Sequence, residues 1–183
     1  MTAQPLRQAS LLRGVNVGGN ALVAMARLRA VYEGLGAEDV ATLLQSGNVV
    51  FRHSSPTAEV SRLAEKAIAA EFGLKIVVIG RTHAQLERIL AVKHFEDAEP
   101  NRRFVVFLSA APEPGSERAL DAFTGANEEL LLVGSELHMH LRDGAGRSRL
   151  QLPVIERKLG VIGTARNWNT VTKLAALTGE ASR

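Results

Sequence analysis

Hydrophobic residues recur with two different periods along this chain. Short runs of aliphatic and β-branched residues predict strands, and stretches whose apolar residues recur every three or four positions predict helices. Gly36 and Gly73 follow the two helical stretches of the first half, at positions where glycine commonly ends a helix. The predicted elements of the first half are a strand at 9–17, a helix at 25–35, β-rich runs within 40–51, a helix at 56–72 and a strand at 74–79.

The dipeptide Ser46-Gly47 divides the β-rich segment 40–51. A turn at this dipeptide predicts a hairpin, and a single strand with a bulge is the alternative. With a hairpin, the order of the first half is β-α-β-β-α-β, which is the order of a ferredoxin-like half.

The second half repeats the beginning of this order. Thr82 and Gln85 form a capping-box pattern that predicts the start of a connecting helix, and the polar segment 94–101 predicts a linker after it. A strand, a short helix, a hairpin and two helices follow. They are predicted at 104–109, 116–123, 129–141, 153–159 and 168–177.

These patterns predict an α+β protein with two ferredoxin-like halves of the β-α-β-β-α-β type, related by duplication. The second half is predicted to end in extra C-terminal helices, whereas the first ends in a strand. The predicted N-terminal half is 1–81, the connecting helix and linker are 82–102, and the C-terminal half is 103–183.

The composition excludes several kinds of site. The chain has no cysteine, so it can form no disulfide, no cysteine-ligated zinc site, no iron–sulfur cluster and no thiol nucleophile. No window approaches the roughly 20 apolar residues of a membrane span, and the first residues lack the layout of a signal peptide. We therefore expect a cytoplasmic protein without a membrane partner. The net charge of +3 permits an anionic partner, but the chain lacks the dense basic runs of a nucleic-acid-binding arm.

The first candidate site is the glycine-rich turn after the first predicted strand. Gly14, Gly18 and Gly19 can direct backbone N–H groups at a phosphate or carboxylate, with Arg13 supplying charge and Asn16 between them. The alternative is a structural turn in which glycine supplies positive φ and Arg13 binds an oxygen of the protein itself. The turn has neither the Gly-Lys-Ser/Thr of a Walker loop nor the GxGxxG spacing of a dinucleotide fold.

Two further stretches carry basic and polar residues beside predicted helices. Arg147 and Ser148 lie in a glycine-rich loop, where they can bind an anion or form a solvated charge cluster. Arg166 and Asn167 are predicted at the opening of the last helix, whose N-terminus favours negative charge, although Asn167 can equally be its N-cap. Trp168 either stacks on a ligand ring or lies in the core, and its helical spacing with later apolar residues favours the core.

His138 and His140 alternate on one predicted strand and therefore point to the same face. Zinc sites use this spacing, but the sequence offers no third ligand, so we predict no metal and no cofactor. No serine lies in a GxSxG elbow or beside a base in the sequence, so no catalytic residue can be named. In an enzyme, His138 or His140 would be the general base.

Four segments of the chain form an unusual set of motifs in a fixed order. They are LLRGVNVGG at 11–19, LQSGNVVF at 44–51, GRS at 146–148 and RNWNTVTKL at 166–174. Together they closely resemble the bacterial family called domain of unknown function 1697. The resemblance implies a duplicated ferredoxin-like architecture and supplies no established activity, cofactor or substrate. Its second segment adds Asn48 to the candidate residues.

These observations predict a binding or regulatory protein that holds a small anionic, phosphate-bearing ligand in a site formed by the loops, between the two halves. A nucleic-acid-binding protein is one alternative, against which the aromatic content of 4% argues. The others are a metal-independent enzyme acting on a phosphorylated or carboxylated small molecule, and a purely structural role for the motifs. The candidate ligand-binding residues are Arg13, Gly14, Asn16, Gly18, Gly19, Asn48, Arg147, Ser148, Arg166 and Asn167.

Overall fold

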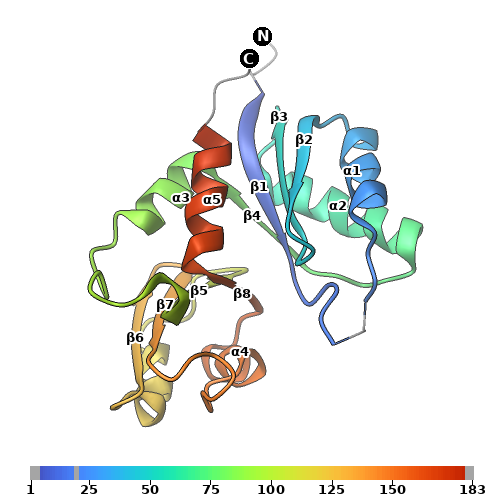
Figure 1. Cartoon of the computed structure of the whole chain (residues 1–183). Coiled ribbons are helices and arrows are strands. Elements are labelled where there is room, and N and C mark those ends of the chain that lie inside the picture. The colour runs from blue at the N-terminus through green and yellow to red at the C-terminus, as the bar shows by residue number, and fades with distance from the viewer. Residues whose placement is uncertain (1–4, 19–20, 180–183) are drawn as a thin grey trace. The chain divides into compact units, whose positions relative to one another are not determined.

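The structure is a computed structural model that describes residues 5–18 and 21–179 (Figure 1). It divides into two compact units, one comprising Met1–Arg88 with Lys173–Arg183 and the other Ile89–Thr172. Each unit contains a four-stranded antiparallel sheet. Among the described residues, no helix is long and apolar enough to cross a membrane.

The first sheet is built from a β-α-β-β-α-β segment that is followed by a helix. In chain order, the elements are β1 (Leu6–Leu12), α1 (Met25–Gly34), β2 (Glu38–Leu43), β3 (Asn48–His53), α2 (Thr57–Phe72), β4 (Val78–Thr82) and α3 (His83–Leu90). The strand order is β2-β3-β1-β4, so β1 pairs with both β3 and β4. Helices α1 and α2 cover one face of the sheet (Figure 1).

The core of the first unit lies between the sheet and these two helices. Tyr32 of α1 and Phe51 of β3 are buried with their ring centroids 5.0 Å apart, and Leu12, Leu28 and Ile68 belong to the same cluster. Burial of this aliphatic and aromatic surface is the main source of folding free energy for the unit.

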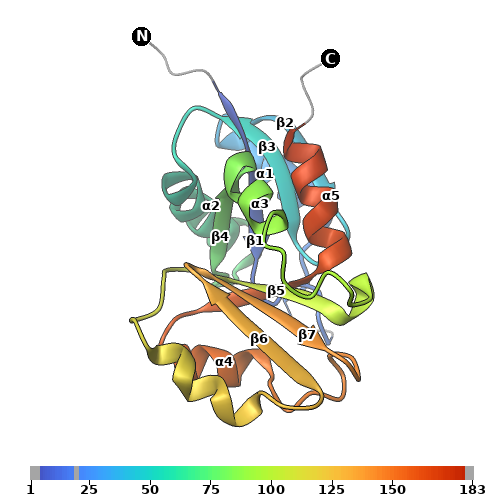
Figure 2. The ribbon, with the colours of Figure 1, turned by 90° about the vertical axis from the view of Figure 1, so that its left-hand side faces the viewer.

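The second sheet has the same design. In chain order, its unit contains the 3₁₀ helix η1 (Pro100–Arg102), β5 (Arg103–Leu108), the 3₁₀ helix η2 (Ser116–Phe123), β6 (Glu128–Val133), β7 (Glu136–Leu141), α4 (Leu152–Leu159), β8 (Gly163–Asn167) and the start of α5 (Trp168–Gly179). The strand order is β6-β7-β5-β8. Figure 2 shows η2 and α4 on one face of this sheet, where Val106, Leu120, Leu137 and Ile155 form the core.

The predicted fold class is confirmed, because both halves follow the β-α-β-β-α-β order and the chain ends in helix α5. Both predicted hairpins form, so a single bulged strand across 40–51 is wrong. The capping box is also present. The Thr82 N–H donates to Gln85 Oε1 at 2.8 Å, and the Gln85 N–H donates to Thr82 Oγ1 at 3.2 Å.

Two predicted strands have different bounds in the structure, and one observed strand is missing from the prediction. Strand β1 ends at Leu12 rather than at residue 17, because Gly14 and Asn16 take positive φ values of 68° and 55°, which extended backbone cannot contain. Strand β4 begins at Val78 rather than at residue 74 and continues through polar residues to Thr82. Strand β8 is absent from the predicted elements, since its Gly-Thr-Ala-Arg-Asn sequence has no apolar alternation.

Candidate ligand-binding site

Asn16 of the first motif is bound on every side by main-chain groups. Its Nδ2 donates to the carbonyl oxygens of Val23, at 2.9 Å, and Gln45, at 2.8 Å, while its Oδ1 accepts the Val23 N–H at 2.9 Å. An asparagine also tolerates the left-handed backbone at this position better than most residues do. Asn16 therefore joins the glycine-rich turn to the β2–β3 turn, and its amide is committed to the fold.

The second motif packs directly against the first. Gly47 lies against the side chains of Val15 and Leu12, and its carbonyl oxygen accepts the Leu12 N–H at 2.8 Å. Asn48 is fully buried, and its Nδ2 donates to Leu43 O at 2.8 Å and to Ser46 Oγ at 3.0 Å. The structure thus brings these two motifs together, and their asparagines hold turns.

The remaining residues of the first motif lie on the rim of this turn. Arg13 is half-buried, and its backbone N–H donates to Val77 O at 2.9 Å. Gly14 and Gly18 are exposed and take positive φ. Gly19 lies outside the described residues.

Replacing Asn16 by alanine is expected to lower the free energy of unfolding by about 2 kcal/mol, because the substitution removes three hydrogen bonds and because alanine tolerates the left-handed backbone less well than asparagine does. Urea denaturation measures the change. Gln45→Ala is the matched control, since Gln45 contributes only its carbonyl oxygen to this contact and its side chain is exposed. Equal losses of stability in the two variants would contradict the conclusion that the Asn16 side chain joins the two turns.

In the third motif, Ser148 is structural and Arg147 is exposed. Ser148 Oγ donates to Glu128 Oε1 at 3.1 Å and accepts the Leu150 N–H at 3.0 Å. In the part of the chain that the structure describes, the Arg147 guanidinium has neither a hydrogen bond nor an ion pair. Of these two candidates, Arg147 is the one whose donors are available to a ligand.

Arg166 lies on strand β8, so its predicted place at the opening of a helix is wrong. The helix α5 begins at Trp168, and Asn167 caps it by accepting the Asn169 N–H on Oδ1 at 3.0 Å. Arg166 is buried and donates from Nη1 to Thr164 Oγ1, at 2.7 Å, and to Ala165 O, at 2.8 Å. Burial lowers the pKa of Arg166 to about 10, so the guanidinium remains charged at neutral pH.

The third and fourth motif regions meet at an apolar pocket of about 200 Å³ on the helix side of the second sheet. Ala145 and Gln151 line it from the loop, and Asn167 lines it from the end of β8. Arg147, Ser148 and Arg166 are not among its lining residues. The pocket is therefore apolar and offers no charge to an anion.

A row of charged and aromatic side chains crosses the opposite face of this sheet. The strand register places Glu129 of β6 beside His140 of β7, and His140 beside Arg103 of β5. Trp168 follows the end of β8 on the other side of Arg103, whose Cζ atom lies 3.8 Å from the centroid of the Trp168 ring. The guanidinium therefore makes a cation–π contact with this half-buried indole.

Arg103 is a buried cation with few partners. Its Nη2 donates to His94 O at 3.3 Å, and no carboxylate of residues 5–18 and 21–179 forms an ion pair with it. Burial lowers the pKa of Arg103, and the negative charge of Glu96 opposes this shift. A buried guanidinium that lacks an anionic partner is unfavourable unless an anion completes it.

His138 of β7 lies on the same face of the sheet as Arg103 of β5. Its side chain is 3% exposed, and its Nε2 atom has no hydrogen-bond partner among the described residues. Burial, followed by the positive charge of Arg103 and the proximity of His94, lowers the pKa of His138 to about 4. The imidazole is therefore neutral at pH 7. Its ring centroid lies 6.4 Å from that of Trp168.

His140 is held by a carboxylate. Its Nδ1 lies 2.6 Å from Glu129 Oε2, which also accepts from Arg142 Nη2 at 3.0 Å. The hydrogen bond from His140 is the main reason that the pKa of Glu129 lies below its usual range. An imidazole held at Nδ1 by a carboxylate can accept a proton at Nε2, as general bases do. The predicted common face of His138 and His140 is present. In the described part of the chain, no group of three or more acidic, histidine or cysteine side chains could hold a metal ion.

The first unit contains an equivalent row, which serves as an internal reference. Arg7 pairs with Arg52 across β1 and β3, as Arg103 pairs with His140 across β5 and β7. Arg7 Nη2 and Arg52 Nη1 lie 3.6 Å and 3.7 Å from the same Asp39 carboxylate oxygen. The arginine of the first row thus has an acidic partner, whereas Arg103 of the second row has none.

A second arginine is repeated in the same way. Arg81 of β4 pairs with Ala9 of β1, and Arg166 of β8 pairs with Val105 of β5. Both side chains are buried, and each Nη1 donates to the carbonyl oxygen of the preceding residue, at 2.9 Å and 2.8 Å. This recurrence indicates that Arg166 has a structural role in addition to any contact with a ligand.

Arg103 and its position on Trp168 are missing from the sequence-based candidates. Arg103 begins a strand, and no glycine-rich or capping pattern surrounds it. The signal that could have found it is internal, because an arginine stands at the same register position of the central strand in each half, at Arg7 and Arg103.

A family model described as protein of unknown function (DUF1697) matches residues 6–138. The chain belongs to this family. The matched segment includes the whole first sheet, the strands β5 and β6 and the first part of β7, so it contains Arg103 and His138. None of the curated proteins matches the chain significantly.

The DUF1697 chain is also similar in structure to a solved protein, the conserved bacterial protein SP0830 from Streptococcus pneumoniae. The TM-score is 0.77 at 22% sequence identity, and the similarity covers 96% of this chain and 99% of that chain. At this identity the similarity establishes a common fold.

Proposed function

We propose that this DUF1697 chain is a cytoplasmic binding or regulatory protein for a small anionic, phosphate-bearing ligand, and that Arg103 on Trp168 is the centre of its site. The observation that carries the proposal is the buried guanidinium without an ion-pair partner in the described residues. A phosphate or carboxylate would neutralise it and accept its remaining N–H groups.

The comparison between the two halves supports this assignment. Asp39 neutralises Arg7 in the first unit, and the acid that stands nearest in the second row, Glu129, is bound to His140 and Arg142 instead. The cation of the second row is thus left to an external anion. Contact with the Trp168 ring fixes the plane of the guanidinium, which favours bidentate recognition of an oxyanion.

His138 and Arg166 lie on the same face of the sheet and extend the site. The register places both beside Val105 on β5, from opposite sides. The Nε2 atom of His138 offers a hydrogen bond that no described residue uses. Asn16 and Asn48 hold turns of the first unit and Ser148 holds the loop before α4, so we assign none of the three a contact with this ligand, whereas Arg147 is exposed on that loop.

Calorimetric titration with inorganic phosphate, nucleoside monophosphates, sugar phosphates and short oligonucleotides tests the proposal. We expect one phosphate-bearing class to bind, with affinity at least about tenfold weaker in Arg103→Gln, because a charge-assisted hydrogen bond is lost. Arg7→Gln is the matched control, since Asp39 already neutralises that arginine. Equal affinities in Arg103→Gln and the unsubstituted chain would refute the assignment. Binding of oligonucleotides alone would favour the nucleic-acid alternative.

A further inference from the structure

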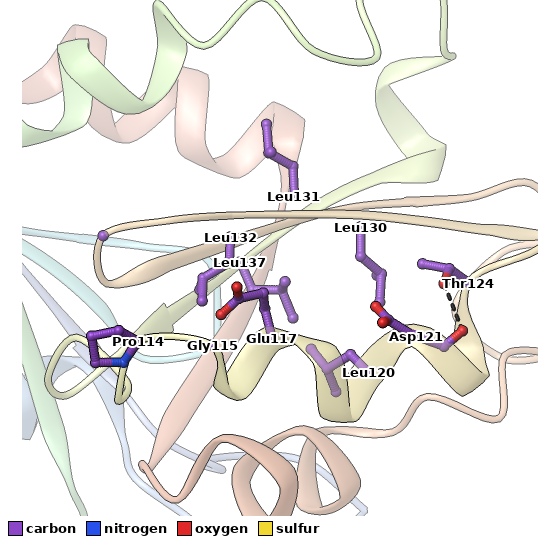
Figure 3. A pocket seen from close by; sticks show the side chains of 11 residues that line it. Pro114, Gly115, Glu117, Leu120, Asp121, Thr124, Leu130, Leu131, Leu132 and Leu137 are labelled. Carbon is purple, nitrogen blue, oxygen red and sulfur yellow. Dashed lines mark hydrogen bonds between the residues drawn. The ribbon is translucent and has the colours of Figure 1, made fainter.

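A separate pocket of about 430 Å³ lies in the second unit, between η2 and the β6–β7 hairpin (Figure 3). Its apolar lining consists mainly of leucines. Leu120 comes from η2, Leu130 and Leu132 from β6, and Leu137 from β7. Such a lining gives favourable contacts to an aliphatic chain.

The charged groups of this pocket all have one sign. Glu117 and Asp121 line it from η2, and Figure 3 shows both carboxylates on the side of the helix that faces the strands. No lysine, arginine or histidine is among the lining residues. Within residues 5–18 and 21–179, neither carboxylate forms an ion pair.

We propose that this pocket binds a small alkylammonium ion, with the ammonium group between Glu117 and Asp121 and the alkyl chain on the leucines. The two parts of such a ligand match the two parts of the pocket. The leucine side chains remove its aliphatic chain from water. Its positive ammonium group remains near the solvent, beside two negatively charged carboxylates.

The sign of the charge separates this pocket from the Arg103 site. An anionic ligand would be repelled by Glu117 and Asp121, and none of the residues around Arg103 lines this pocket. The proposal is therefore independent of the proposed function, and either can fail without the other.

Calorimetric titrations of the full chain with butylammonium, hexylammonium and hexanoate test the proposal. Burial of each added methylene is worth about 0.8 kcal/mol, so affinity is expected to rise about fourfold per methylene from butylammonium to hexylammonium. Hexanoate has the same apolar part with the opposite charge and should not bind. Comparable binding of hexanoate and hexylammonium would overturn the proposal, and so would the absence of saturable hexylammonium binding.

Replacing the two carboxylates by amides tests whether they bind the ammonium group. The double variant Glu117→Gln, Asp121→Asn keeps the shape of both side chains and should bind hexylammonium about fivefold more weakly, as expected for the loss of two exposed ion pairs. Glu113→Gln is the control, because Glu113 is exposed just before the same helix and does not line the pocket. Unchanged affinity in the double variant would overturn the assignment of these two residues.

Discussion

Replacing Gly47 by alanine is expected to lower the free energy of unfolding by about 4 kcal/mol, the largest effect of any single substitution considered for this fold. Gly47 has φ of +73°, which L-residues adopt at a cost. A β-carbon there would also collide with Val15 Cγ2 and lie 2.8 Å from Leu12 Cβ. Both neighbours are buried, so they cannot move aside cheaply.

Gly134 is the matched control for this prediction. It occupies the turn of the second hairpin and also has positive φ, +59°, but a β-carbon there would meet no atom within 4 Å. Gly134→Ala should therefore cost only the backbone strain, about 1 kcal/mol. Urea denaturation of both variants separates the two contributions. Similar losses of stability in the two variants would show that Val15 and Leu12 can move aside for a β-carbon. Gly47 would then be needed only for the backbone conformation of its turn.

Acidification is expected to destabilise the protein by up to about 3 kcal/mol through His138. In the unfolded chain the imidazole becomes protonated as the pH falls through 6.5, whereas in the native state burial and the nearby Arg103 lower its pKa to about 4. Between these values the unfolded state binds a proton that the native state does not bind. Stability contributed by His138 is therefore complete above pH 6.5, decreases as the pH falls, and is lost below about 4.

The measurement is the urea midpoint as a function of pH in the unsubstituted chain and in His138→Gln. Glutamine does not titrate, so the variant should lose less stability between pH 6.5 and 4. Parallel pH profiles in the two proteins would show that His138 does not carry the dependence.

The fold class follows from the sequence because the apolar periods and turn residues agree with one another. The hairpin turns and the Thr82–Gln85 capping box are local signals, and all of them are present. Strand β8 escapes prediction because its sequence has no apolar alternation, and its backbone is held by pairing with β5, which is distant in the sequence. Arg166 is buried on this strand, and a charged side chain gives no sign of such burial in the sequence.

The motif residues illustrate why candidate sites are harder to predict. Asn16 and Asn48 have the polar amides that a ligand site needs, but their partners are carbonyl groups brought close by the fold, at Gln45 and Leu43. Sequence cannot distinguish an amide that binds a ligand from one that holds a turn. Arg103 shows the converse, because no local motif surrounds it, and its burial and its position on Trp168 identify it as a candidate.

The division of helix α5 between the two units has a consequence for the order of folding during synthesis. The first unit comprises residues from both ends of the chain, since Arg7 donates to Leu177 O at 3.4 Å and His83 Nδ1 lies 3.2 Å from Thr178 Oγ1. On the ribosome, these late residues emerge only after the whole second unit has been made. The unit whose translation begins first is thus completed only after the second unit has been synthesised.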